Sequence, residues 1–134
     1  MTPASLDITI LGSGTSTGIP VVGCDCPVCC SDDPRNRRTR CSALLSYSGR
    51  NLLIDTSTDL RHQALRENIR NIDAVLYTHC HADHVHGIDD LRGFNLRSRQ
   101  PIPIYGATET LRRISLLFEY IFEDETPSGH VPQL

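Results

Sequence analysis

Residues 74–87 read AVLYTHCHADHVHG and decide the fold class of this chain. The opening AVLY predicts a short strand that is buried on both sides within a sheet. Four histidines and one aspartate follow within eight residues, where the strand leaves the sheet. Open α/β sheets place their ligand sites at these carboxyl ends of strands. The stretch therefore predicts an α/β domain with a metal-binding site after a central strand.

The histidines have the spacing of metal ligands. His79 and His81 project to one side of an extended segment, because its side-chain period is two, and are predicted to hold one ion together. Asp83 and His84 lie just past them and are predicted to hold a second ion. Imidazole suits Zn, Fe, Ni and Cu, and a carboxylate extends the choice to Mn. A lone histidine is usually an ordinary surface or core residue, but four crowded imidazoles have little structural use without a metal.

Strands are predicted on both sides of this stretch. Alternating apolar residues indicate strands at 6–11, 42–47, 51–55 and 102–105. A Ser-Gly pair at 48–49 is expected to form the hairpin turn between the second and third of these strands. A proline within the last strand places it at an edge of the sheet.

Two helices are predicted from apolar residues that recur every three or four positions. Ser57 or Thr58 is expected to cap the first helix, and the second is expected to begin at Thr108. Their buried faces are predicted to carry Leu60, Ala64, Leu65 and Ile69 in the first helix and Leu111, Ile114, Leu117, Phe118, Ile121 and Phe122 in the second. The tail 123–134 has no pattern and is expected to lack order unless something holds it.

The cysteines are concentrated in one loop. Cys24, Cys26 and Cys29 have the spacing C-x-C-x₂-C, which suits one side of a tetrahedral structural zinc site whose fourth ligand comes from elsewhere. Residues 19–40 have no periodic pattern and are therefore predicted to form a Cys-rich zinc-binding loop. The alternative is a set of three free thiols.

Composition excludes several classes of protein. A chain of 134 residues, with 39% hydrophobic and 22% charged residues, fits a single domain spanning 1–134. It has no apolar run long enough to span a bilayer and no signal-peptide pattern at its start. A net charge of −3 and 5% aromatic residues make nucleic acid an unlikely partner. We expect a cytoplasmic protein with reduced thiols.

The pattern His79-x-His81-x-Asp83-His84 resembles the signature of the metallo-β-lactamase superfamily of metal-dependent hydrolases. Residues 12–20, GSGTSTGIP, are similar to the start of its phosphodiesterase branches, which include ribonuclease Z. The stretch LIDT, which contains Asp55, resembles the strand end whose aspartate supports the metal site from behind. Capping of a helix is the alternative role for this aspartate.

The Cys-rich loop narrows the resemblance to one branch. With Cys24, Cys26 and Cys29, it resembles the PhnP-like cyclic phosphodiesterases, in which this loop binds a structural zinc. A protein of pyrroloquinoline quinone biosynthesis has a similar loop and ranks second.

The resemblance implies a fold and an activity. The fold is a mixed sheet covered by helices, the first half of an αββα sandwich. The full domain would hold two catalytic Zn²⁺ or Mn²⁺ ions, in addition to the structural Zn²⁺. The implied reaction is attack of metal-activated hydroxide on a cyclic or small phosphodiester, with Asp83 as the catalytic residue that orients or deprotonates the nucleophile.

The chain resembles only the first half of such a domain, so it is interpreted as truncated. The later metal ligands of the family are not identifiable, and the surroundings of His130 do not resemble the segment that carries the third histidine. Half a sandwich exposes an apolar sheet face, which dimerisation would bury.

Two other functions stay open at this point. One is a hydrolase of the same superfamily with another substrate, such as an RNA 3′ end, a thioester, a lactam or an intermediate of cofactor biosynthesis. The other is a non-catalytic zinc-binding fragment, which the incomplete set of ligands supports.

Overall fold

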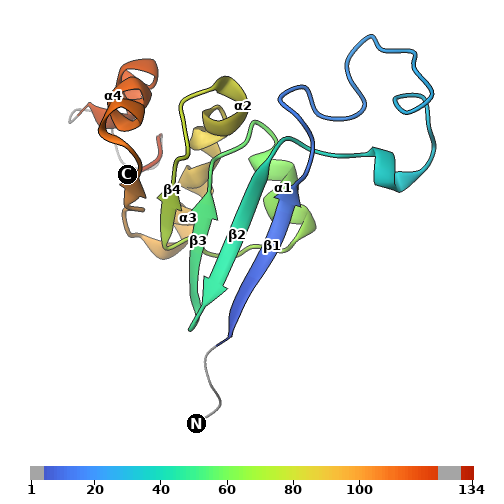
Figure 1. Cartoon of the computed structure of the whole chain (residues 1–134). Helices are drawn as coiled ribbons and strands as arrows, with labels where there is room; N and C mark the ends of the chain where they lie inside the picture. Colours follow the sequence, from blue (N-terminus) through green and yellow to red (C-terminus); the bar gives the residue numbers. More distant parts are fainter. Residues whose placement is uncertain (1–4, 124–130) are drawn as a thin grey trace.

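A five-stranded mixed sheet with helices on one face makes up the protein (Figure 1). This computed structural model describes residues 5–123 and 131–134. The strands lie in chain order, and the first three are antiparallel neighbours, whereas the last three are parallel neighbours. They are β1 (Leu6–Gly12), β2 (Ser42–Tyr47), β3 (Arg50–Ile54), β4 (Ala74–Leu76) and β5 (Ile104–Tyr105).

The parallel strands explain why the helices lie on one side. A parallel pair needs a crossover connection, and crossovers of the same hand place consecutive helices on the same face of the sheet. Figure 1 accordingly shows helices α1 and α3 together behind the sheet. The helices are α1 (Leu60–Arg66), α2 (Ala82–Val85), α3 (Arg92–Ser98), α4 (Thr108–Leu117) and α5 (Glu119–Phe122), with 3₁₀ turns at Pro34–Asn36 and Ile88–Leu91. Within the described residues, no helix is both long and apolar enough to cross a membrane.

One apolar layer between the sheet and the helices forms the core. Leu53 and Val75 are paired across β3 and β4, and both are fully buried against the helices. Leu60 of α1 and Ile114 of α4 are fully buried as well. The remaining buried members of this cluster are Leu11, Leu44, Ile72, Tyr77, Val85, Ile88, Leu91, Ile102 and Ile121.

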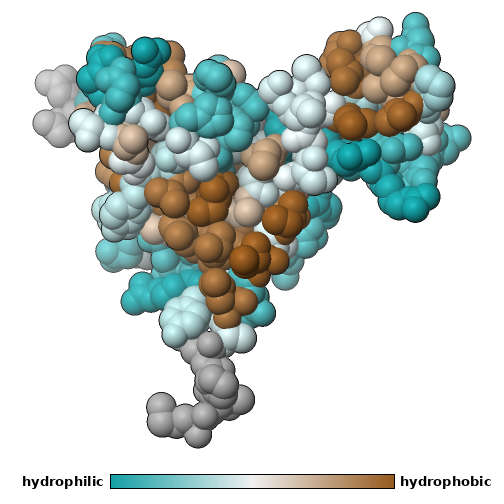
Figure 2. All heavy atoms as spheres, in the orientation of Figure 1, coloured by the Kyte–Doolittle hydropathy of each residue, from teal (hydrophilic) through white to brown (hydrophobic). Residues whose placement is uncertain are grey.

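The opposite face of the sheet is apolar and open. Figure 2, in the orientation of Figure 1, shows hydrophobic side chains gathered over the strands. Ile8 in β1 is 60% exposed, and Leu45 of β2 lies directly opposite it. Antiparallel strands that face water normally direct polar residues toward it, whereas β1 directs Leu6, Ile8 and Ile10 toward solvent. We call this surface the open sheet face; its exposed large members are Leu6, Ile8, Ile10, Tyr47, Leu76 and Tyr105.

The predicted α/β class, the strands and the edge position of β5 are confirmed. Burial of residues 74–77 on both sides is wrong, because Leu76 is 37% exposed on the open sheet face. The first helix ends at Arg66, before Ile69, and its Leu65 is 65% exposed.

The C-terminal part of the chain also differs from expectation. The second predicted helix is interrupted at Phe118, whose backbone leaves the helical region at φ −126° and ψ 43°. The sequence pattern missed the short helices between residues 82 and 98. Part of the predicted tail lies outside the described residues, but Gln133 accepts a 2.9 Å hydrogen bond from the Ile102 backbone N–H.

Candidate functional site

The histidine cluster lies where the chain leaves β4. We call residues 78–87 the His loop. It begins at the carboxyl end of β4, beside the carboxyl end of the parallel strand β3. The ring centroid of His79 lies 4.6 Å from that of His81 and 4.0 Å from that of His84. The structure therefore brings three of the predicted ligand side chains together.

Asp55 supports this cluster from the end of β3. Its side chain is buried, and its Oδ1 accepts a 2.8 Å hydrogen bond from the Thr78 backbone N–H. Its Oδ2 accepts a 2.7 Å bond from the Thr78 hydroxyl and lies 2.7 Å from Nδ1 of His84. Asp55 also has a left-handed backbone, with φ of 59°, a strained conformation that is common at functional sites. The helix-capping alternative is wrong, because the N-cap position of α1 is Asp59.

These hydrogen bonds define which nitrogen each histidine offers. The Thr78 hydroxyl donates to Asp55, so its oxygen is left to accept from Nδ1–H of His79, 3.0 Å away. The carboxylate of Asp55 likewise accepts from Nδ1–H of His84. Both rings then direct a lone pair on Nε2 away from Asp55, which is the arrangement that metal-binding histidines adopt.

The donor set fits a divalent metal. Oδ2 of Asp83 lies 3.2 Å from Nε2 of His84. Two ligand atoms that bind one zinc ion at ~2.0–2.1 Å are separated by roughly 3.0–3.4 Å at ordinary bond angles. Asp83 and His84 are therefore spaced to share an ion, and imidazole and carboxylate together suit Zn²⁺ or Mn²⁺.

A buried network holds the His loop on the sheet. The Thr56 hydroxyl lies 3.0 Å from the Tyr77 hydroxyl and donates to the carbonyl oxygen of Val85 at 3.1 Å. Burial raises the pKa of Tyr77, so this phenol stays protonated. A Cβ at Gly87 would collide with the Ser57 carbonyl oxygen, so glycine is required here. Sequence reasoning missed these residues; the glycine after the histidines was the available signal.

The three predicted zinc-binding thiols form a second cluster in the Cys loop, residues 19–40. The sulfur atoms of Cys24, Cys26 and Cys29 all lie within 4.8 Å of one another. Within residues 5–123 and 131–134, no other set of three or more potential ligand side chains meets this spacing; in the His loop the rings are neighbours, but three ligand atoms are not gathered this closely. The group fits three positions of a tetrahedral zinc site and leaves one position for a further donor.

The thiols differ in acidity. The Cys29 backbone N–H donates to Sγ of Cys26 at 3.5 Å, and this bond, with the neighbouring thiols, lowers the pKa of Cys26 to about 7. At Cys29 the Val21 backbone N–H favours the thiolate, but desolvation and the neighbouring thiols outweigh it and raise the pKa. Cys26 therefore ionises before Cys29.

The Cys loop is attached to the sheet through a narrow neck. Ile19 and Arg38 exchange two backbone hydrogen bonds of 2.9 Å. The Gly14 backbone N–H donates to the Thr39 carbonyl oxygen at 2.8 Å and joins the same two segments of chain closer to the sheet. Figure 1 shows the loop projecting away from the sheet, and residues 24–29 follow Ile19 along the chain beyond this neck. His130 lies outside the described residues.

Comparison with known proteins places this geometry in a family. The family model described as β-lactamase superfamily domain matches residues 50–133, which include the whole His loop. A crystal structure of a diphosphatase from the PhnP family is 48% identical, with a TM-score of 0.83 over 88% of this chain and 49% of that one.

Two further relatives are similar. An octanoyltransferase of Porphyromonas gingivalis is 46% identical over 121 residues, which are 90% of this chain and 24% of that protein. Zn²⁺-bound PqqB from Methylobacterium extorquens is 34% identical, with a TM-score of 0.65 over 81% of this chain and 39% of that one. The chain thus spans less than half the length of each of these relatives.

Proposed function

The chain belongs to the β-lactamase superfamily domain family, and from that premise we propose that it forms the metal-binding half of a phosphodiesterase. The substrate is a cyclic or small phosphodiester. The observation that carries this proposal is the convergence of His79, His81 and His84 on one another, with Asp55 behind them. The similarity to a PhnP-family diphosphatase supports phosphorus as the centre that is attacked.

Each side chain of the His loop has a role in this proposal. His79 and His81 hold one divalent ion, and Asp83 and His84 hold a second. When bound, such ions lower the pKa of water and neutralise charge that develops on phosphate oxygens. Asp83 orients the attacking water or accepts its proton. The carboxylate of Asp55 keeps the protons of the imidazoles on Nδ1, directly at His84 and through Thr78 at His79.

Completion of the site requires groups that the His loop does not supply. The His loop provides four side chains for two ions, whereas a catalytic zinc site uses about three protein ligands for each ion. We expect the open sheet face to be covered in the active form, since it is apolar and lies next to the carboxyl ends of β3 and β4. A second copy of the chain is one means of covering it.

The test combines metal binding with hydrolysis. Titration calorimetry with Zn²⁺ and Mn²⁺ gives the number of ions bound, and bis(p-nitrophenyl) phosphate and 2′,3′-cyclic AMP serve as substrates. We expect the H81A/D83A double variant to lose hydrolysis and the ions of the His loop. The matched control is His62→Ala, which removes an exposed histidine of α1 outside the loop. Full activity of the double variant would overturn the proposal.

A metal-binding module without turnover is the second candidate. It is favoured by the three-thiol group, whose donors are gathered independently of the sheet. Its signature in the same experiment is stoichiometric metal binding by both loops with no hydrolysis of either substrate.

A further inference from the structure

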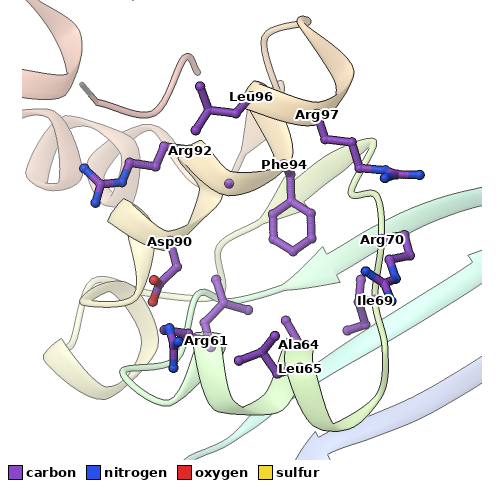
Figure 3. A pocket seen from close by; sticks show the side chains of 12 residues that line it. Arg61, Ala64, Leu65, Ile69, Arg70, Asp90, Arg92, Phe94, Leu96 and Arg97 are labelled. Carbon is purple, nitrogen blue, oxygen red and sulfur yellow. The ribbon is translucent and has the colours of Figure 1, made fainter. Parts of the chain in front are cut away.

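A groove runs between α1 and α3 on the helical side of the molecule, on the face of the sheet opposite to the open sheet face. It encloses a cavity of about 360 Å³, within the range of functional pockets. In Figure 3, the ring of Phe94 points into the centre of this groove, above Ala64 and Leu65 of α1. No residue of the His loop lines it, so the proposed hydrolysis does not account for it.

Apolar side chains lie open to solvent along this groove. Leu65 of α1 is 65% exposed and Leu96 of α3 is 61% exposed. Both line the cavity, from opposite helices. Neither residue belongs to the buried core cluster. Apolar surface that lines a concave site and has no structural use marks an interaction site.

Arginines lie at both ends of the groove. Figure 3 shows Arg61 and Arg92 on one side of Phe94, with Asp90 between them, and Arg70 and Arg97 on the other side. Burial raises the pKa of the Asp90 carboxyl, and the positive charges of Arg61 and Arg92 oppose that rise. The groove therefore concentrates four positive charges and one negative charge in a chain whose net charge is −3.

The arginine pair at one end has no internal partner. In the described part of the chain, neither Arg70 nor Arg97 forms an ion pair or a side-chain hydrogen bond. Arg112 and Arg113 on α4, by contrast, both bind Glu109. Like charges that are held together at a rim, without an acid, favour an anionic partner.

We propose that this groove binds an acidic amphipathic helix of a partner protein. Leucine-like side chains of that helix pack on Phe94, Leu65 and Leu96, while its carboxylates pair with the arginines at the Arg70–Arg97 end. This is the helix-in-groove mode of recognition, in which apolar anchors supply burial and charges supply orientation. Bound RNA is disfavoured, because aliphatic side chains line the groove and its aromatic ring is half-buried rather than displayed for base stacking.

The experiment uses fluorescence anisotropy with a labelled helical peptide of about 16 residues, long enough to form a helix. Its leucines recur every three or four positions, and its remaining residues are glutamate and alanine. We expect saturable binding that weakens about tenfold in the R70E/R97E variant, since two attractive pairs become repulsive. The matched control is R112E/R113E, which makes the same charge change on α4 and leaves binding intact.

A second variant tests the apolar contacts separately. L65Q/L96Q changes exposed side chains only, so it should fold normally, which circular dichroism checks, and it should weaken peptide binding about fivefold. Equal binding of a peptide with lysine in place of glutamate would overturn the proposal. So would binding of a labelled single-stranded RNA, but not of the peptide, that is lost in R70E/R97E. Self-association abolished by the same variants would assign the groove to a second copy and also overturn it.

Discussion

The Cys loop and the His loop both gather side chains of the kinds that bind metal ions, but they assemble them by different means. The three thiols of the Cys loop lie within six residues, and their sulfur atoms are within 4.8 Å of one another. No residue of the sheet belongs to this group. The His loop takes its ligands from residues 79–84 but depends on Asp55, which belongs to another strand. The first cluster is a local chelate, and the second is a product of the sheet.

This difference teaches where each site is vulnerable. A substitution in the sheet should disturb the His loop and spare the thiols, because the thiols lie beyond the neck at Ile19 and Arg38. A substitution among the thiols should release zinc from the Cys loop and leave the core intact. Removal of a thiol from the Cys loop and removal of the carboxylate that supports the His loop therefore test whether the two sites are independent.

The largest expected effect is the loss of zinc from the Cys loop in Cys26→Ser. This change leaves two thiols of the group, too few for a structural zinc site. We expect elemental analysis to show about one zinc ion fewer per chain, with an unchanged thermal midpoint of the sheet. Cys41→Ser is the control, since Cys41 is exposed and lies outside the group. Retention of the ion in Cys26→Ser would contradict the assignment.

The second effect is a loss of metal affinity at the His loop in Asp55→Ala. Removal of a carboxylate that orients a metal-binding histidine costs about 10–100-fold in affinity. It also leaves the partners at Thr78 and His84 without an acceptor, which should lower the free energy of unfolding by about 2–3 kcal/mol. Titration calorimetry and urea denaturation measure the two effects.

The control for Asp55→Ala is Asp73→Ala. Asp73 also accepts a backbone hydrogen bond, from the Asn51 N–H at 2.8 Å. It directly precedes β4, beside the start of β3, and so lies at the end of these strands away from the His loop. The Asp73→Ala variant should lower the free energy of unfolding without changing the metal affinity of the His loop. Equal losses of affinity in both variants would show that Asp55 acts only through the stability of the sheet, and the comparison of the two loops would then lose its basis.

Sequence reasoning succeeded where one signal was contained in one segment. Strand periodicity predicted β1 and β2 to within one residue, and the spacing of the thiols predicted their proximity. It failed where the answer depends on pairing between segments. The sequence does not distinguish support of the metal site from helix capping as the role of Asp55. The difference becomes visible only when β3 pairs with β4, which brings Asp55 to His84, 29 positions later in the chain.

Other failures have equally specific causes. α2 and the 3₁₀ turn at Ile88–Leu91 have four residues each, too few to display a helical period. Leu65 fits the apolar pattern of α1, but it lines the groove instead of the core. The exposure of Leu76 follows from a sheet that carries helices on one face only, which a pattern of apolar residues cannot reveal.

The third effect concerns the sheet on which the His loop depends. We expect the chain to self-associate through the open sheet face and Ile8→Lys to weaken that association about tenfold, because it places a charge where an apolar residue is 60% exposed. Sedimentation equilibrium gives the association constant. Val22→Lys is the control, since Val22 is 96% exposed in the Cys loop. A wild-type chain that is monomeric at high concentration would contradict this expectation.

The smallest effect is a shift in the reactivity of Cys26, which tests whether the Cys loop is organised without metal. The Cys29 backbone N–H and the neighbouring thiols hold the pKa of Cys26 near 7, so iodoacetamide should modify it with a midpoint of about pH 7 in metal-free protein. An ordinary thiol with a pKa of ~8.5 is only about 3% ionised at that pH. Since folding lowers this pKa, the thiolate favours the folded loop above the ordinary thiol pKa, and this contribution fades as the pH falls through 7. A midpoint near 8.5 would mean that the loop gathers its thiols only around a bound ion. The Cys loop would then depend on the ion, as the His loop depends on Asp55 of another strand.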